Sequence, residues 1–357
     1  MLKKVKIENL KGIKNCEIKD LALINLFIGK NNSCKSTILE SIYYGLSEFS
    51  PRPSLLEMLK HRTDVFVGGR ELWFNQAIGN TIAIYYEFEN NAKLELKMDF
   101  EVLTQQIACR TTVEENNIRA EYIGSSYSSS NLGVSTAITI NKFDPKKKST
   151  TLQTYIDTMF FLESKRGFIS GAEVYLSLFK VIGRTREFGK YLQKIYGIGK
   201  EWEFVPSLDN SKEFRASAMV NELPYLLSGL GDGMKVAVPI LAVSIINRNS
   251  AILVEEIESN QHPAALKGLL IEIVKLCIKN NIQLFLTTHS LEVNNILYYD
   301  VFEGTEERAQ QYHCYFVDRN IDSGNVTCEE VITEEKEGDH RKVAKALLSS
   351  GDYEPVP

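Results

Sequence analysis

The chain has 357 residues, of which 44% are hydrophobic and 24% are charged. This is an ordinary globular composition, and the length allows one large domain or two smaller ones with sizeable cores. The net charge of −5 and the pI near 5.7 exclude an overall basic field for nucleic acid, so DNA binding would need a local basic patch.

The cysteines, the first residues and the apolar stretches argue against a zinc or disulfide-stabilised protein, a secreted protein and a membrane protein. Six cysteines are scattered without C-x-x-C spacing, which disfavours a zinc site or a disulfide framework and favours a reduced, cytosolic setting. The first residues alternate in polarity, so no signal peptide is expected. The longest apolar stretch, near 236–246, is too short to span a bilayer. We therefore expect a soluble cytoplasmic protein without a membrane segment.

The N-terminal region predicts strands followed by a helix. Residues 4–10 alternate as a half-buried strand does, and 16–21 reads as the returning strand. An apolar run over 24–28 predicts a further strand, and a helical pattern follows over 36–49.

The region from 51 to 150 is dominated by strand patterns. Residues 81–88 and 93–100 alternate around a polar turn and predict a hairpin. Further strands are expected over 107–113, 118–123 and 134–140, with a Ser-rich loop over 124–132.

The second half alternates helical and strand patterns. The expected helices cover 172–195, 226–246 and 264–279, and the expected strands cover 159–162, 202–205, 251–257 and 282–287. Such alternation predicts an α/β core with parallel strands. Near the C-terminus, strands over 312–317 and 325–332 precede a charged, helix-prone segment over 334–348.

A candidate phosphate-binding loop follows the strand at 24–28. The sequence GKNNSCKST matches the G-x-x-x-x-G-K-[ST] pattern at every fixed position except the second glycine; in this pattern, loop amides and a helix N-terminus bind phosphate. Lys35 would reach the outer phosphates and the Ser36 hydroxyl would ligate Mg²⁺. The candidate ATP-binding residues are Gly29, Lys30, Asn31, Asn32, Ser33, Cys34, Lys35, Ser36 and Thr37. An ordinary polar turn with a chance Lys-Ser-Thr is the alternative.

Cys34 departs from this pattern, because it stands where the second glycine belongs. Glycine suits the position where backbone approaches phosphate closely or needs a positive φ. Since Cys34 lies beside Lys35 and a helix N-terminus, we expect a lowered pKa for its thiol.

Two carboxylates and a histidine stand at the ends of the predicted buried strands. Within the strand expected over 251–257, the continuous apolar run Ala251–Val254 is typical of burial on both faces and ends in Glu255 and Glu256. Ligands of open α/β sheets bind at the carboxyl ends of strands, so Glu255 and Glu256 are expected beside the phosphate loop. One could hold Mg²⁺, usually through water, and the other could polarise an attacking water. His289 could sense or stabilise the γ-phosphate. The alternatives are a solvated acidic pair at a strand end and a structural histidine.

A glycine-rich turn, LLSGLGDGMK over 226–235, opens a predicted helix. It would be a second helix N-terminus with free amides, and hence a second anion site. One nucleotide does not need two such sites, so the second would cap a nucleotide held by another subunit. A plain glycine-rich helix start is the alternative.

In this order, the motifs resemble those of ABC-type ATPases of the SMC/RecF/OLD branch, close to its stand-alone AAA-type ATP-binding proteins. The opening KIENLKGIK, residues 6–14, is similar to the first strand and turn of these heads. The resemblance implies an α/β P-loop NTPase fold, with a β-rich subdomain and a helical signature subdomain. It implies a single head over 1–332, containing a β-rich insertion at 51–150 and a signature region at 170–250, then a charged tail at 333–357.

The resemblance also implies site roles and partners. Ser36 and Glu255 would hold Mg²⁺, Glu256 would be the general base and His289 the switch histidine. A homodimer would hold two ATP molecules, each between one subunit's phosphate loop and the partner's signature. The signature residues acting in trans would be Ser228, Gly229, Gly231, Asp232 and Gly233. Residues 259–263 fall where the D-loop lies.

The expected function is an ATP-hydrolysing dimer that drives or licenses a partner in DNA maintenance or in defence against phage and foreign DNA. The partner would be a separate effector, such as a nuclease, and DNA is a further candidate ligand. The alternative is a nucleotide-sensing switch that dimerises on ATP and hydrolyses it slowly or not at all. Cys34 and Glu255, which replace the usual glycine and aspartate, keep this alternative open.

Overall fold

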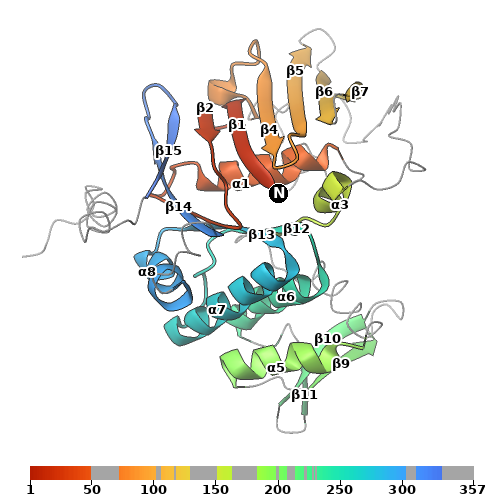
Figure 1. Cartoon of the computed structure of the whole chain (residues 1–357), viewed down its shortest axis with the longest axis vertical. Helices are drawn as coiled ribbons and strands as arrows, with labels where there is room; N and C mark the ends of the chain where they lie inside the picture. The colour runs from red at the N-terminus through yellow and green to blue at the C-terminus, as the bar shows by residue number, and fades with distance from the viewer. Residues whose placement is uncertain are drawn as a thin grey trace, which may run out of the picture. The chain divides into compact units, whose positions relative to one another are not determined.

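The computed structural model describes residues 1–49, 72–101, 106–115, 118–128, 151–162, 183–197, 201–206, 214–220, 223–226, 229, 231–302 and 311–331. The chain divides into two units: Met1–Met159 with His313–Pro357, and Phe160–Tyr312. Each unit has its own strands and helices, labelled in Figure 1.

The first unit contains a six-stranded antiparallel sheet in the order β2-β1-β4-β5-β6-β7 (Figure 1). Its strands are β1 (Leu2–Leu10), β2 (Ile13–Ile18), β4 (Ile82–Phe88), β5 (Lys93–Glu101), β6 (Gln106–Glu115) and β7 (Ile118–Ser128). The alternation of β1 buries Val5 and Ile7, as its sequence predicted, and Leu10 is buried after Asn9, whose φ of 57° interrupts the alternation. The predicted hairpin is confirmed as β4 and β5, and β4 pairs with β1, so the hairpin extends the N-terminal sheet.

Two predictions in this sheet were wrong at their boundaries. The returning strand begins at Ile13, because Leu10 pairs directly with Ile13 across a two-residue turn with Lys11 at φ 50°. Strand β7 pairs with β6 as far as Ser128, so 124–128 is strand and not loop. Residues 129–132 and the strand expected over 134–140 lie outside the described residues.

The strand and helix predicted around the phosphate loop are confirmed as β3 (Ile24–Ile28) and α1 (Lys35–Ser47). Every residue of β3 is buried, and its neighbour β14 (Tyr312–Arg319) pairs with β15 (Val326–Glu330). The sequence did not predict α3 (Thr151–Asp157) or the short 3₁₀ turn η2 (Phe74–Gln76).

Helix α1 packs closely on the antiparallel sheet. The buried hydroxyl of Tyr86 on β4 donates a hydrogen bond of 2.6 Å to the Ser41 carbonyl. A Cβ on Gly45 would overlap that hydroxyl, so glycine at this position lets the helix approach β4. This contact fixes the helix whose first residues end the phosphate loop.

The second unit contains three parallel strands in the order β13-β12-β8. These are β13 (Ile282–Thr288), β12 (Ser250–Val254) and β8 (Phe160–Leu162). All residues of β12 and β13 are buried, as expected where helices cover a parallel sheet. Helix α6 (Asp232–Ile246) packs against β12 and α7 (Pro263–Asn280) against β13 (Figure 1). The predicted α/β alternation is therefore confirmed.

The remaining elements of this unit lie around the glycine-rich segment and after β13. They are α5 (Thr185–Tyr196), a three-stranded sheet β11-β10-β9 (Leu223–Leu226, Phe214–Val220, Trp202–Pro206), α8 (Leu291–Asn295) and the π-helix η4 (Ile296–Val301). The helix predicted from Leu226 begins at Asp232, because Leu226 pairs with Ser217 in the sheet. The helix predicted over 172–195 is described only from Thr185, since 172–182 lies outside the described residues.

The expected division into a single head over 1–332 with a tail at 333–357 stays a prediction. Residues 332–357, including the helix expected over 334–348, lie outside the described residues. Within the described part of the chain, no helix is long and apolar enough to cross a membrane.

Candidate functional site

The loop between β3 and α1 has a backbone that bends sharply. Asn32 and Cys34 have φ values of 64° and 72°, in the left-handed region that favours glycine. Helix α1 begins directly after Cys34, and no side chain caps its start among the described residues. Its first amides therefore offer the anion site expected of such a helix N-terminus.

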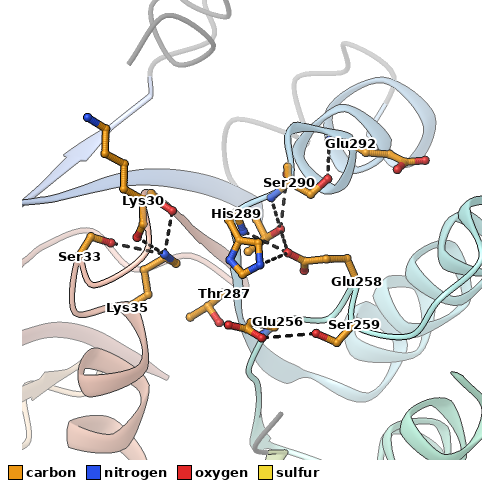
Figure 2. Close-up of polar contacts among 12 residues, drawn as sticks. Lys30, Ser33, Lys35, Glu256, Glu258, Ser259, Thr287, His289, Ser290 and Glu292 are labelled. Carbon is orange, nitrogen blue, oxygen red and sulfur yellow. Dashed lines mark hydrogen bonds and ion pairs between the residues drawn. The ribbon is translucent and has the colours of Figure 1, made fainter. Parts of the chain in front are cut away.

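The Lys35 ammonium lies inside this loop (Figure 2). Its Nζ donates hydrogen bonds to the carbonyl oxygens of Gly29 and Lys30, both at 2.7 Å, and contacts Ser33 Oγ at 3.4 Å. Lys35 is only 7% exposed, so these contacts fix a positive charge within the loop.

Strand β14 approaches the start of the loop so closely that only glycine fits at position 29. A Cβ there would overlap the Val317 carbonyl oxygen of β14 and would lie 2.9 Å from Ser33 Oγ. The contact with β14 therefore explains why the first position of the pattern is glycine in this fold.

The other predicted loop residues differ in accessibility. Asn31 and Asn32 are exposed, whereas Lys30, Ser36 and Thr37 are half-buried. The Ser36 hydroxyl is an oxygen ligand of the kind Mg²⁺ prefers. The loop thus combines amides, one fixed cation and a hydroxyl, a donor set that fits the phosphates of a nucleotide and a bound Mg²⁺.

The surroundings of Cys34 contradict the expectation that its thiol has a lowered pKa. Burial raises the pKa of its thiol above the ordinary value, and the Arg319 guanidinium and Lys35 ammonium offset this only in part. A Cβ on Gly12 would lie 2.8 Å from Cys34 Sγ and 3.4 Å from Arg319 Cζ, so both side chains lie over Gly12. The expected lowering of the pKa was wrong because the partial burial of the thiol outweighs the effect of the two nearby positive charges.

This arrangement leads to a labelling prediction for Cys34. Since its pKa is raised, alkylation by iodoacetamide should be slow near neutral pH and should accelerate as the pH rises above the ordinary thiol pKa. Mg-ATP should protect the residue, as measured by mass spectrometry of the loop peptide. Labelling at equal rates with and without saturating ATP would place the nucleotide elsewhere. Cys34→Gly, which suits a φ of 72°, should fold normally and keep or raise any hydrolysis.

Glu255 and Glu256 follow β12 in the second unit and have different surroundings. Glu255 is 6% exposed, and its backbone N–H donates to the Leu162 carbonyl at 2.9 Å. Glu256 is half-buried with φ 50°; its N–H donates to Thr287 Oγ1 at 3.0 Å and its Oε2 accepts from Ser259 Oγ at 3.4 Å (Figure 2). The two carboxylates therefore end the strand as predicted, with Glu256 the more accessible.

His289 lies in the turn after β13 and its side chain is 41% exposed. Its N–H donates to Glu258 Oε1 at 3.1 Å, and its Nε2 lies 3.8 Å from the same oxygen (Figure 2). The turns after β12 and β13 are thus joined, as expected for neighbouring parallel strands.

The glycine-rich segment begins helix α6. Gly231 is the N-cap, and a Cβ on Gly233 would lie 2.8 Å from the Asn260 carbonyl oxygen. Gln261 Nε2 donates to the Gly233 carbonyl at 2.7 Å, and its Oε1 accepts from Tyr196 at 2.8 Å. The structure therefore links this helix start to the 259–263 segment. Ser228 lies outside the described residues, while Gly229 and Asp232 are exposed.

The contacts of three residues near these motifs were not predicted: those of Glu258, of Gln261 within the 259–263 segment, and of Arg319. Each of these contacts joins residues about 30 or more positions apart in the chain, which no local sequence pattern reveals. The described residues contain no group of three or more His, Cys, Asp or Glu side chains arranged for a metal.

Comparisons with known proteins agree with these motifs. Residues 24–294 match the family AAA_21, described as "AAA domain, putative AbiEii toxin, Type IV TA system". The "ATP/GTP phosphatase" of Helicobacter pylori is 22% identical over an alignment of 328 residues that covers 83% of this chain and 87% of that protein. "Uncharacterized protein MJECL11" of Methanocaldococcus jannaschii is 36% identical over 80 residues, which is 22% of this chain and 70% of that protein.

A solved structure shows the same fold at low identity. It is the Smc head domain with an extended coiled coil, bound to the C-terminal domain of ScpA and derived from Pyrococcus furiosus. The TM-score is 0.51 at 12% identity, covering 97% of this chain and 99% of that chain. Since the family match runs from β3 past His289, the chain belongs to the AAA_21 family and has the P-loop NTPase fold of ABC- and SMC-type heads.

Proposed function

We propose that this protein binds Mg-ATP and hydrolyses it to ADP and phosphate. The observation that carries the proposal is the buried Lys35 ammonium, held inside a bent loop at the start of α1. Lysine in this position contacts the outer phosphates in P-loop proteins. The name of the Helicobacter pylori relative, an ATP/GTP phosphatase, supports hydrolysis.

In this proposal the first unit binds the phosphates. The α1 amides and Lys35 would hold the β- and γ-phosphate oxygens. The proposed Mg²⁺ ligands are Ser36 and Glu255, and the ion would neutralise charge on the phosphates. Because Lys35 is fixed by the Gly29 and Lys30 carbonyls, its charge needs little reorganisation.

The second unit would act on the attacking water. Glu256 is the proposed general base: it is half-buried, and the Thr287 and Ser259 hydroxyls hold its backbone and carboxylate. His289 is the proposed switch residue, whose exposed imidazole would hydrogen-bond the γ-phosphate oxygens as charge develops.

We propose that two copies form a homodimer around two ATP molecules. The helix N-terminus at Gly231 to Gly233 would contact the nucleotide bound by the partner copy, together with Ser228 and Gly229. Gln261, which bonds the Gly233 carbonyl, would transmit movement between this helix and the 259–263 segment. Size-exclusion chromatography with light scattering, with and without ATP, measures this association.

The proposed biological role is to license a separate effector in DNA maintenance or in defence against phage and foreign DNA, within the cytoplasm. Of these two roles, the family description "putative AbiEii toxin, Type IV TA system" supports the one in defence. The Pyrococcus furiosus SMC head is bound to a domain of another protein, which supports an effector partner for this head. A nuclease partner and DNA itself are both candidates.

A second candidate function is a nucleotide sensor that dimerises on ATP and hydrolyses it slowly or not at all. Cys34 favours it, because a side chain in the left-handed region stands where the loop pattern has glycine. Glu255 favours it too, since its longer side chain changes the reach to Mg²⁺ compared with aspartate.

Steady-state phosphate release separates the two functions. We expect Mg²⁺-dependent turnover below the ~10 s⁻¹ typical of enzymes, measured for the pure protein alone and with DNA. ATP-dependent dimerisation without turnover would select the sensor. If ATP neither binds nor is turned over, both functions are excluded.

A further inference from the structure

Glu258 makes a set of contacts that all lead to the turn carrying His289. Its Oε1 accepts hydrogen bonds from Thr288 Oγ1 at 2.7 Å and from the His289 N–H at 3.1 Å (Figure 2). The same oxygen lies 3.8 Å from His289 Nε2. One carboxylate oxygen therefore contacts the histidine's backbone and lies near its ring.

The burial of Glu258 distinguishes it from an acid that merely ends a solvated turn. Its side chain is 16% exposed, and Oε2 is buried without a hydrogen-bond partner among the described residues. A carboxylate in such surroundings costs stability unless its contacts offset the loss of water. The contacts present are those to Thr288 and His289, and Thr288 is itself fully buried.

The two threonines of the sequence TTHS have complementary roles. Thr287 Oγ1 accepts from the Glu256 N–H at 3.0 Å, while Thr288 Oγ1 donates to Glu258 and accepts from the Ser290 N–H at 2.9 Å. These bonds join the turn after β12 to the turn after β13. The same pair of turns carries the proposed base and the proposed switch histidine.

We propose that Glu258 is a positioning residue for His289, acting through the hydrogen bonds that Oε1 accepts from the turn. By holding the Thr288 hydroxyl and the His289 backbone N–H, it sets the direction in which the imidazole projects. This inference rests on the proposed function for its effect on catalysis, but the placement of the imidazole can be measured without any hydrolysis.

The kinetic test compares Glu258→Ala with Glu258→Gln. The alanine removes the acceptor and should lower kcat about 10- to 100-fold, as loss of an orienting partner does at metal-bound histidines, while KM for ATP stays within about twofold. The glutamine keeps an amide oxygen that can accept both hydrogen bonds, and should restore kcat to within about threefold of wild type. Equal impairment of the two variants would overturn the proposal. Glu292→Gln, an exposed acid three residues beyond His289, is the matched control and should match wild type.

A double-mutant cycle tests whether Glu258 acts through the histidine. In a His289→Ala background, Glu258→Ala should lower kcat by less than about twofold, because the residue that it positions is gone. A full additional loss in that background would show an independent role and would refute the positioning. Thr288→Val removes the Oγ1 donor at nearly constant volume. If Glu258→Ala does not fold, Thr288→Val replaces it in the same double-mutant cycle with His289→Ala.

The imidazole signals give a readout that does not depend on activity. The chain has five histidines, and His289→Ala identifies the His289 resonances in a long-range ¹H–¹⁵N spectrum. Glu258→Ala should shift these resonances, and Glu258→Gln should return them toward wild type. Unchanged His289 signals in Glu258→Ala would overturn the inference. If the wild type hydrolyses no ATP, the proposed function fails, while this spectrum still decides where Glu258 holds the ring.

Discussion

Replacing Lys35 by alanine should lower the affinity for ATP by at least two orders of magnitude. The ammonium is 7% exposed and is held by two carbonyl oxygens, so it is a fixed cation inside the loop. Hydrogen bonds to charged groups contribute about 1.5–3 kcal/mol each, and about 1.4 kcal/mol corresponds to a tenfold change in binding. Loss of two such contacts to phosphate therefore predicts at least a 100-fold increase in Kd, measured by calorimetry with Mg-ATP.

Lys275→Ala provides a control for general loss of positive charge. Its ammonium is 65% exposed on α7 and pairs with Glu272 at 3.8 Å, so ATP affinity should not change. Thermal unfolding of both variants checks that the fold is intact, since Lys35 also bonds the loop itself. Wild-type affinity in a folded Lys35→Ala protein would reject the phosphate-loop assignment.

Glu256→Gln should abolish hydrolysis while leaving ATP bound. The amide is nearly the same size as the carboxylate and keeps an oxygen that can accept from Ser259, but it cannot take a proton from water. The bond from the Glu256 N–H to Thr287 is unaffected, so the turn should keep its shape. General bases contribute about 10²- to 10⁴-fold, so kcat should fall by that factor while the Kd for ATP stays within about threefold.

This variant should also accumulate the ATP-bound dimer. If hydrolysis separates the two copies, blocking it leaves the dimer in place, and light scattering after size-exclusion chromatography should show twice the monomer mass in Mg-ATP. A Glu256→Gln protein with wild-type turnover would move the base to another acid, with Glu255 tested first. Monomeric Glu256→Gln in saturating ATP would contradict the proposed dimer while leaving the base assignment untouched.

Local patterns in the sequence were sufficient for the elements around both motifs. The apolar run 24–28, the glycine and the following helical pattern predicted β3, the loop and α1, and the structure has all three. The run Ala251–Val254 predicted a strand buried on both faces, ending at two acids, and β12 ends at Val254. These predictions succeed because a strand's burial and a helix's periodicity are properties of neighbouring residues. The motif order likewise indicated the P-loop fold that the family match and the SMC head confirm.

Contacts between distant segments decided what the sequence left open or predicted wrongly. Proximity to Lys35 suggested a lowered thiol pKa for Cys34, but burial of the thiol in the fold raises it, and the Arg319 guanidinium, far along the chain, offsets this only in part. The acids after β12 looked alike in sequence, yet Glu258 contacts the turn at 288–289 and Glu256 lies beside Thr287. Gly29 is needed because of the Val317 carbonyl, a neighbour almost three hundred residues away. Hydrogen bonding and desolvation depend on which segments the fold brings together, and a residue's own sequence neighbours do not carry that information.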